Sequence, residues 1–252
     1  MEVFQDYSYY YNLFYRDKDY KKEAEQIDFL LKEYGNNVKT IISFGCGTGK
    51  HDIELLKMGY CMEGIDASKT MLDIAKKNFK ENNIEEKVEI ADIRFFEAHK
   101  YYDAVISLFH VISYQNSNED VLKSFRSARK ALKNGGIFLF DVWYGPGVLT
   151  DLPIVRVKEV EDKERRLIRI AQPLLHDKTN VVDVCYEILI SDKNTNITKN
   201  IKETHSMRYF FRPELEMLLA ETGFELIDNL DCNTLKETNY NSWTSYFIAK
   251  AV

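Results

Sequence analysis

Apolar runs of strand length alternate with amphipathic segments between residues 38 and 142. Strand-length runs separated by helix-length segments predict strands joined by crossover helices, and such units form a parallel sheet with right-handed connections. We therefore expect an α/β fold built on a doubly wound, mostly parallel sheet. The predicted strands cover residues 38–44, 60–65, 88–91, 102–107 and 136–142, and the predicted helices cover 49–58, 68–80 and 119–132.

The pattern changes after residue 154. Strand-like segments then follow one another without an intervening helix, which predicts an antiparallel sheet inserted into the α/β fold. A helical pattern later returns, and two more strands complete a seven-stranded main sheet. The inserted strands are predicted at 155–160, 166–173, 181–191 and 197–209, the helix at 213–222, and the last two strands at 224–230 and 243–250.

These patterns predict two structural units in one chain. Residues 1–148 and 211–252 are expected to form the main domain, which includes a mostly helical, Tyr-rich stretch at 7–35. Residues 149–210 are expected to form the inserted sheet, which would serve either the substrate or a dimer interface.

Composition narrows the choice of partners. Lys and Arg number 34 and Asp and Glu 40, and the basic residues form no block, so a nucleic-acid partner is disfavoured. No apolar run approaches the roughly 20 residues that cross a bilayer, and the acidic, aromatic N-terminus is unlike a signal peptide. We expect a cytoplasmic protein that acts on a small molecule as a monomer or homodimer, with no nucleic-acid or membrane partner.

The cysteines and histidines do not predict a metal site. The four cysteines are far apart and none belongs to a Cys-x-x-Cys pair, so isolated reduced thiols are favoured over zinc ligands or disulfides. The five histidines never occur at helical i, i+4 spacing. No Ser-His-Asp or Cys-His arrangement follows from the spacing either.

The most informative motif is the glycine-rich segment 44–49, Phe-Gly-Cys-Gly-Thr-Gly, which follows the first predicted strand. Glycine lacks a Cβ, so its backbone can turn sharply and approach a ligand. The helix that follows offers unpaired N–H groups at the same place. The next strand ends in Asp66, 21 positions after Gly45, where a carboxylate can reach a ribose. Together these features predict a nucleoside-containing cofactor.

Four motifs, at 44–49, 64–68, 91–94 and 135–138, occur in the order and spacing of the class I S-adenosylmethionine-dependent methyltransferases. The chain resembles this family over essentially its whole length, which implies S-adenosyl-L-methionine as the cofactor and S-adenosyl-L-homocysteine as the product. The resemblance also implies which residues bind the cofactor: Tyr15, Gly45, Cys46, Gly47, Gly49, Asp66, Ala67, Met71, Asp92, Ile93 and Leu108.

Among these residues, the resemblance implies that Asp66 binds the ribose hydroxyls and Asp92 the adenine amino group. The alternatives are that Asp66 caps the following helix and that Asp92 begins a turn. The sequence departs from the family at Ser43, where many relatives carry an acidic residue that is often tied to the methionine amine. Asp141 or a tyrosine is then a candidate for neutralising that amine.

A narrower resemblance is to the N-methyltransferases of nucleotide-linked amino sugars. It is carried by segments 11–15 and 18–24, by Met71-Leu72, Asp92-x-Arg94 and residues 103–105, and by the late inserted sheet. This resemblance implies that Tyr11 and Tyr15 close over the methionine end of the cofactor. Core packing of an amphipathic helix is an equal alternative for Tyr11.

Methyl transfer is an in-line displacement, so the enzyme mainly aligns the acceptor and excludes water, and a base is needed only for a protonated acceptor. We expect the stretches 107–114 and 141–147, which follow strand ends, to meet the acceptor. His110 is the favoured base because histidine is the residue type whose unperturbed pKa lies near working pH; a structural or substrate-orienting role is the alternative. The candidate catalytic residues are His110, Tyr11 and Asp141.

Aromatic and basic side chains are candidates for binding the acceptor. Trp143 and Tyr144 could stack on a sugar or base, and Arg156 and Arg208 suit phosphate oxygens. A solvated sheet face is the alternative for the charged residues of the insert. The full set of candidate acceptor contacts is Tyr114, Trp143, Tyr144, Arg156, His205 and Arg208.

The expected function is methyl transfer from S-adenosylmethionine to nitrogen or oxygen of a small acceptor, a sugar or nucleotide-linked sugar of surface-glycan or secondary-metabolite synthesis. Two alternatives stay open. One is an O-methyltransferase for a phosphorylated or phosphoramidate-type metabolite of capsule assembly. The other is a non-catalytic cofactor-binding scaffold.

Overall fold

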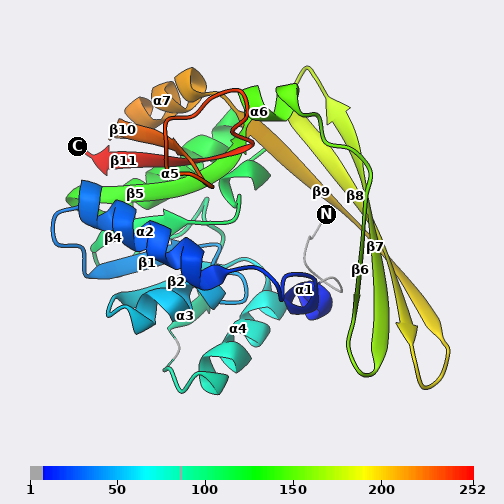
Figure 1. Ribbon diagram of the computed structural model, residues 1–252. Helices are drawn as coiled ribbons and strands as arrows, with labels where there is room; N and C mark the ends of the chain where they lie inside the picture. The colour runs from blue at the N-terminus through cyan, green and yellow to red at the C-terminus, as the bar shows by residue number, and fades with distance from the viewer. Residues whose placement is uncertain (1–7, 86) are drawn as a thin grey trace.

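The computed structural model describes residues 8–85 and 87–252. Its main sheet has the order β3-β2-β1-β4-β5-β11-β10, in which the first five strands are parallel and β11 runs antiparallel to its two neighbours, β5 and β10 (Figure 1). This arrangement confirms the predicted α/β fold with a mostly parallel sheet. The strands are β1 (Thr40–Phe44), β2 (Cys61–Asp66), β3 (Val88–Ile90), β4 (Tyr102–Ser107), β5 (Leu132–Tyr144), β10 (Phe224–Asp231) and β11 (Thr244–Ala251).

Helices cover both faces of the main sheet. On one face, α2 and α3 pack through buried residues such as Ile27, Leu30 and Leu55, and on the other face α5 and α7 pack through Phe125 and Leu215. Helix α4 packs against α3 through a smaller cluster. The helices are α2 (Tyr20–Tyr34), α3 (Lys50–Lys57), α4 (Lys69–Glu81), α5 (Asn118–Ala131) and α7 (Arg212–Glu221).

Side chains cap the N-terminal ends of α2 and α4. Asp19 accepts a hydrogen bond from the Lys22 N–H at the start of α2, and Ser68 accepts one from the Met71 N–H at the start of α4. Such caps satisfy donors that the helix itself leaves unpaired. The α4 cap is important for the site because it fixes the end of β2, where Asp66 lies.

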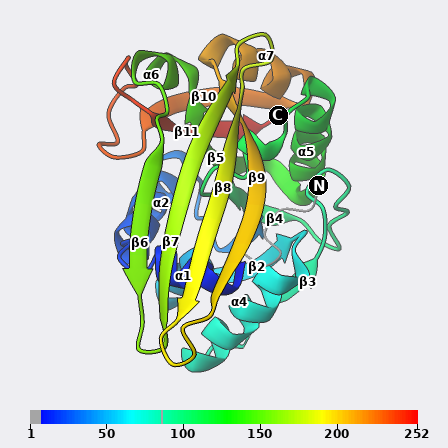
Figure 2. The ribbon, with the colours of Figure 1, turned by 90° about the vertical axis from the view of Figure 1, so that its right-hand side faces the viewer.

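The inserted strands form a long antiparallel sheet that leans away from the main sheet (Figures 1 and 2). Its last strand meets the main sheet at only two parallel pairs, Trp143 with Tyr209 and Tyr144 with Phe210. Helix α1 packs under this sheet through Tyr11 and Phe14. These elements are α1 (Ser8–Phe14), β6 (Arg156–Glu161), β7 (Arg165–His176), β8 (Val181–Asp192) and β9 (Thr198–Phe210).

Two short helices follow strand ends and were not predicted: η1 (Ile112–Tyr114) after β4 and α6 (Gly145–Thr150) after β5. The predicted helical stretch at 7–35 is split into α1 and α2. Residues 1–7, which include the start of that stretch and of the expected main domain, lie outside the described residues, as does residue 86. Within the described part of the chain, every helix falls short of the length and apolarity needed to cross a membrane.

Candidate functional site

The glycine turn lies at the carboxyl end of β1 and is anchored to β2. The backbone N–H groups of Gly45 and Cys46 both donate to the carbonyl oxygen of Ile65, at 2.8 and 2.9 Å. Gly45, Gly47 and Gly49 all have positive φ angles, of 74°, 56° and 72°, a region that other residues adopt only at a cost. The sequence therefore needs glycine here for the backbone shape itself.

The three glycines differ in what surrounds them. A Cβ on Gly45 would lie 2.5 Å from the Val111 side chain, and one on Gly49 would lie 2.7 Å from the Phe79 ring. A Cβ on Gly47 would meet nothing within 4 Å. Gly45 and Gly49 thus allow close packing of the protein, whereas Gly47 presents bare backbone to open space, where a ligand can approach.

Asp66 closes the turn from the end of β2. Its Oδ2 accepts the N–H of Gly47 at 2.9 Å, and its Oδ1 accepts the N–H of Ser68 at 2.8 Å. Burial raises the pKa of Asp66, while these two backbone bonds act against that rise. Each carboxylate oxygen has a second lone pair, so Asp66 can hold the turn and still accept two hydroxyl groups.

Asp92 has a protein partner of its own. The guanidinium of Arg94 bonds both carboxyl oxygens of Asp92, through Nε at 3.0 and 3.1 Å and Nη2 at 2.6 Å, and also pairs with Asp120 of α5. Burial acts to raise the pKa of Asp92, but the bonds from Arg94 outweigh burial and lower this pKa overall. An adenine amino group at Asp92 would therefore share this carboxylate with Arg94. Next to it, Ile93 is buried in the core.

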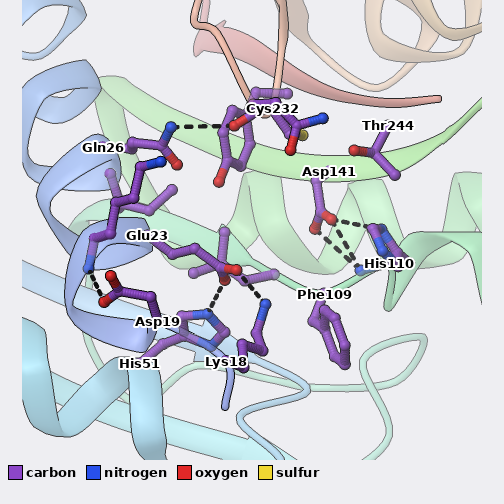
Figure 3. Close-up of a pocket in the computed structure, with 15 residues that line it drawn as sticks. Lys18, Asp19, Glu23, Gln26, His51, Phe109, His110, Asp141, Cys232 and Thr244 are labelled. Atoms are coloured by element: carbon purple, nitrogen blue, oxygen red, sulfur yellow. Dashed lines mark hydrogen bonds and ion pairs between the residues drawn. The ribbon is translucent and has the colours of Figure 1, made fainter. Parts of the chain in front are cut away.

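A cavity of about 300 Å³ lies between the N-terminal end of α2 and the carboxyl ends of β4 and β5 (Figure 3). On the helix side, Glu23 pairs with Lys18 and lies 2.6 Å from Nε2 of His51. Burial opposes ionisation of Glu23, but its bonds to His51 and Lys18 prevail and lower its pKa to about 2. The Lys18 ammonium also lies 4.2 Å from the centre of the Phe109 ring. Lys18 and Glu23 belong to segment 18–24, which carries the narrower resemblance, but neither was predicted as a site residue.

His110 and Asp141 meet on the opposite side of this cavity (Figure 3). Asp141, only 4% exposed, accepts the backbone N–H of His110 at 3.0 and 3.2 Å and lies 2.6 Å from Nδ1 of the same residue. The two atoms do not meet hydrogen-bond geometry, but an anion at this distance still favours the tautomer that carries its proton on Nδ1, which leaves the lone pair of Nε2 available. Asp141 thus orients a candidate base.

A larger cavity of about 840 Å³ lies beside the first and shares its His110 wall. It runs between α1, the loop after β4 and the inner face of β7, β8 and β9. The predicted residues that the structure brings together around it are Tyr11, Tyr15, His110, Tyr114, Trp143, Arg156 and His205.

A chain of polar contacts crosses the inserted-sheet side of this larger cavity. The Tyr114 hydroxyl lies 2.8 Å from Nδ1 of His205, and Nε2 of His205 lies 3.3 Å from the Glu203 carboxylate. Burial, above all, raises the pKa of Tyr114 well above its usual range, so its hydroxyl stays protonated. The Tyr114 oxygen is then a fixed hydrogen-bonding group in the cavity wall.

The structure corrects the expected place of two residues. Arg208 points away from the cavity, where it pairs with Glu214 of α7 and bonds Asn118 at 2.7 Å. Tyr144 is buried in the main core, and its neighbour Trp143 lines the cavity instead. The reason is the two-residue alternation of a strand: His205 and Met207 of β9 face the cavity, so Arg208 faces the other side.

The cavity contains two residues that the sequence reading missed. Arg169 of β7 donates from Nη1 to the Tyr15 hydroxyl at 3.3 Å, and its guanidinium lies 5.1 Å from the centre of the Tyr186 ring. Alternation along β7 could have suggested Arg169, which shares a face with Ala171, another cavity residue.

Among the other predicted cofactor residues, Cys46 and Met71 are buried, Leu108 lines the smaller cavity and Ala67 is exposed.

Comparison with known proteins shows which proteins the whole chain is similar to. Residues 41–136 match the family described as methyltransferase domain. The chain is similar to a dTDP-3-amino-3,4,6-trideoxy-alpha-D-glucopyranose N,N-dimethyltransferase of Streptomyces venezuelae, at 23% identity over 88% of this chain and 91% of the relative. It is also similar to the putative methyltransferase YqeM of Bacillus subtilis, at 25% identity over 89% of this chain and 87% of the relative. A solved structure with the same fold is the sugar N-methyltransferase KedS8 of Streptoalloteichus, with a TM-score of 0.81 and 20% identity over 100% of this chain and 96% of that one.

The described residues fit S-adenosylmethionine. Gly47 presents open backbone beside Asp66, whose carboxylate has lone pairs to spare for a ribose diol. His51, two residues after the glycine turn, lines the smaller cavity. The same cavity is lined by cationic Lys18 and anionic Asp141. An amino-acid end carries one charge of each sign, so these two side chains are complementary to it.

Proposed function

We propose that this S-adenosylmethionine-dependent methyltransferase methylates the amine of a nucleotide-linked amino sugar. The observation that carries the proposal is the larger cavity, which brings a carboxylate-oriented histidine, aromatic walls and two arginines to the carboxyl ends of the parallel strands. The names of the Streptomyces relative and of the Streptoalloteichus enzyme support nitrogen of a sugar as the acceptor atom.

S-Adenosylmethionine supplies, when bound, a methyl group on a positively charged sulfur. Gly47 and Asp66 would bind its nucleoside, and Lys18 and Asp141 would face its amino-acid end. In this arrangement Asp141 fills the role that Ser43 cannot, because a hydroxyl carries no charge to balance an ammonium group.

His110 would prepare the acceptor. An amino sugar is largely protonated at neutral pH, and an ammonium group has no lone pair with which to attack carbon. Nε2 of His110, freed by the Asp141 contact at Nδ1, would take one proton from the ammonium. The N–H bond would break and its electron pair would stay on nitrogen, where it would be available for the methyl group that the bound cofactor would supply. The proton passes from His110 to solvent.

The inserted sheet, residues 149–210, would hold the acceptor in place. Arg156 and Arg169 lie in the same cavity wall and suit the two phosphates of a nucleoside diphosphate. Tyr114, fixed by His205, would bind a sugar hydroxyl or the amine itself. The walls formed by Trp143 and Tyr186 offer apolar faces to the sugar.

Incubation with S-adenosylmethionine and the relative's substrate, dTDP-3-amino-3,4,6-trideoxy-alpha-D-glucopyranose, followed by mass spectrometry, tests the proposal. We expect the sugar to gain one or more methyl groups on nitrogen. The matched control is the same nucleotide sugar with a hydroxyl in place of the amine, which should stay unmethylated. Methylation of the hydroxyl compound would contradict the nitrogen assignment. Bound cofactor without turnover on a panel of dTDP- and UDP-amino sugars would overturn the proposed substrate class.

A further inference from the structure

Asp52 is a buried carboxyl group that the proposed mechanism does not use. It lies in the first turn of α3 and is 1% exposed. Among the described residues, neither of its carboxyl oxygens meets hydrogen-bond geometry with a partner, although the Ser43 hydroxyl is near enough to favour the ionised form. Buried carboxyl groups are normally paired, because an unpaired charge in the protein interior is costly.

Asp52 sits directly behind the glycine turn. A Cβ placed on Gly64 would lie 2.9 Å from Oδ2 of Asp52 and 2.9 Å from Cβ of Cys46, so the three residues converge on one point. Cys46 belongs to the turn itself, and its neighbour Gly47 faces open space. The turn is therefore the layer between the Asp52 carboxyl and the open face of Gly47, where the nucleoside cofactor would bind.

Among the described residues, the charge that acts on Asp52 is the negative one of Asp66. Burial raises the pKa of the Cys46 thiol well above its usual range, and Asp52 and Asp66 both add to that rise, so the two carboxyls act on the turn together. The neighbouring His51 pairs with Glu23 of α2 instead. Within residues 8–85 and 87–252, no ion pair involves Asp52. Burial first, and Asp66 second, raise the pKa of Asp52 to about 7.

We propose that Asp52 senses the charge of the bound cofactor, favouring the cationic sulfonium of S-adenosylmethionine over the neutral sulfur of S-adenosylhomocysteine. A cation bound over the turn stabilises the Asp52 carboxylate, so its O–H bond breaks and the proton leaves to solvent. The coupling is reciprocal: an ionised Asp52 binds the cation more tightly. Once the methyl group is transferred, the positive charge is gone, Asp52 takes up a proton, and the product loses this attraction.

This inference goes beyond the proposed function and does not depend on which acceptor is methylated. Isothermal titration calorimetry, with S-adenosylmethionine and S-adenosylhomocysteine titrated separately between about pH 6 and pH 8, tests it directly. Repeating each titration in two buffers with different enthalpies of ionisation gives the number of protons released. Both measurements read binding and need no acceptor.

We expect S-adenosylmethionine to release a fraction of a proton near pH 7 and S-adenosylhomocysteine to release less. The ratio of the two dissociation constants, product over substrate, should rise about three- to tenfold across this pH range, as a charge pair near a protein surface implies. Equal proton release by both ligands, or a ratio that does not change with pH, would overturn the proposal.

The variant Asp52→Asn keeps the shape of the side chain and removes its titration. We expect it to lose the pH dependence of the ratio and the difference in proton release. The matched control is Asp73→Asn, which removes an exposed carboxylate of α4 that pairs with Lys69 and should behave as wild type. A folded Asp52→Asn variant that keeps the wild-type pH dependence would refute the role of Asp52. If that variant fails to fold, the wild-type proton release decides alone.

Discussion

Asp141 bonds the backbone N–H of His110 with both carboxyl oxygens and lies 2.6 Å from Nδ1 of its imidazole ring. The contact joins the end of β5 to the loop after β4. Phe109 and His110 both have positive φ angles, of 63° and 67°, which are rare outside glycine. Asp141 thus holds a strained backbone and a ring orientation at the same time, on the wall shared by the two cavities.

The variant Asp141→Asn should separate these two roles. An amide still accepts the His110 N–H but no longer favours a proton on Nδ1. We expect kcat to fall about 100-fold, the lower end of what a positioned base contributes, and the pH dependence of kcat to change. His110→Gln should lose a similar factor, and the double variant little more, because the two residues act as one unit. Additive losses in steady-state kinetics would contradict this coupling.

The glycine turn predicts two different substitution effects. Gly47→Ala adds a methyl group that meets no protein atom within 4 Å, at the cost of a positive φ. The free energy of unfolding should fall by about 1–2 kcal/mol, yet cofactor binding should be lost because the methyl group enters the ligand's space. Calorimetric titration and thermal unfolding measure the two effects.

Gly45→Ala is the matched comparison, because its methyl group would meet Val111 at 2.5 Å. We expect a larger loss of stability, which Val111→Ala should partly restore by removing the clashing atoms. A Gly47→Ala variant that binds cofactor like wild type would show that the open face of Gly47 is not where the nucleoside lies.

The sequence predicted the main sheet within a few residues because apolar periodicity and turn chemistry are local. The strand at Tyr102–Ser107 was predicted with its exact bounds. Helix α6 was missed because its geometry depends on a distant segment: a Cβ on Gly147 would collide with the backbone of Ser242. No local pattern carries that information.

The same difference between local patterns and long-range contacts explains which site residues the sequence could predict. The sequence could predict that Gly45 and Asp66 lie close together because their spacing is local to one strand–turn–helix–strand unit. Alternation sorts the residues of β7 and β9 into two faces, but Arg208 was misplaced and Arg169 missed because the face that meets the cavity depends on distant packing, such as that of α1 against Leu167. Asp52 was missed because its carboxyl group becomes buried only when β2 and the glycine turn pack over it.

Arg169 and Arg208 should differ in the quantity that their loss affects. Arg169→Gln removes a charge from the acceptor cavity, so we expect KM for a nucleotide-linked sugar to rise about tenfold or more while the unfolding temperature changes little. Arg208→Gln leaves Glu214 without its partner in a nearly buried site, so stability should fall by about 3 kcal/mol. Steady-state kinetics and thermal unfolding of both variants check this, and a KM effect confined to Arg208→Gln would contradict the assignment.

Asp52 should also shape the pH dependence of stability in the absence of cofactor. Its pKa is raised from 3.8 to about 7 in the folded protein, chiefly by burial. Between these values the folded state holds a proton that the unfolded state has lost, so stability is greatest below the window and falls as pH rises through it. A shift of about three pH units corresponds to at most about 4 kcal/mol of unfolding free energy.

In the Asp52→Asn variant this decline of stability with pH should vanish. Denaturant unfolding of both proteins at about pH 4.5, 6 and 8 measures the decline. Glu23 and Asp103, whose pKa values fall to about 2, affect both proteins equally, so the difference between the two curves isolates Asp52. Parallel curves for wild type and variant would mean that Asp52 is ionised throughout.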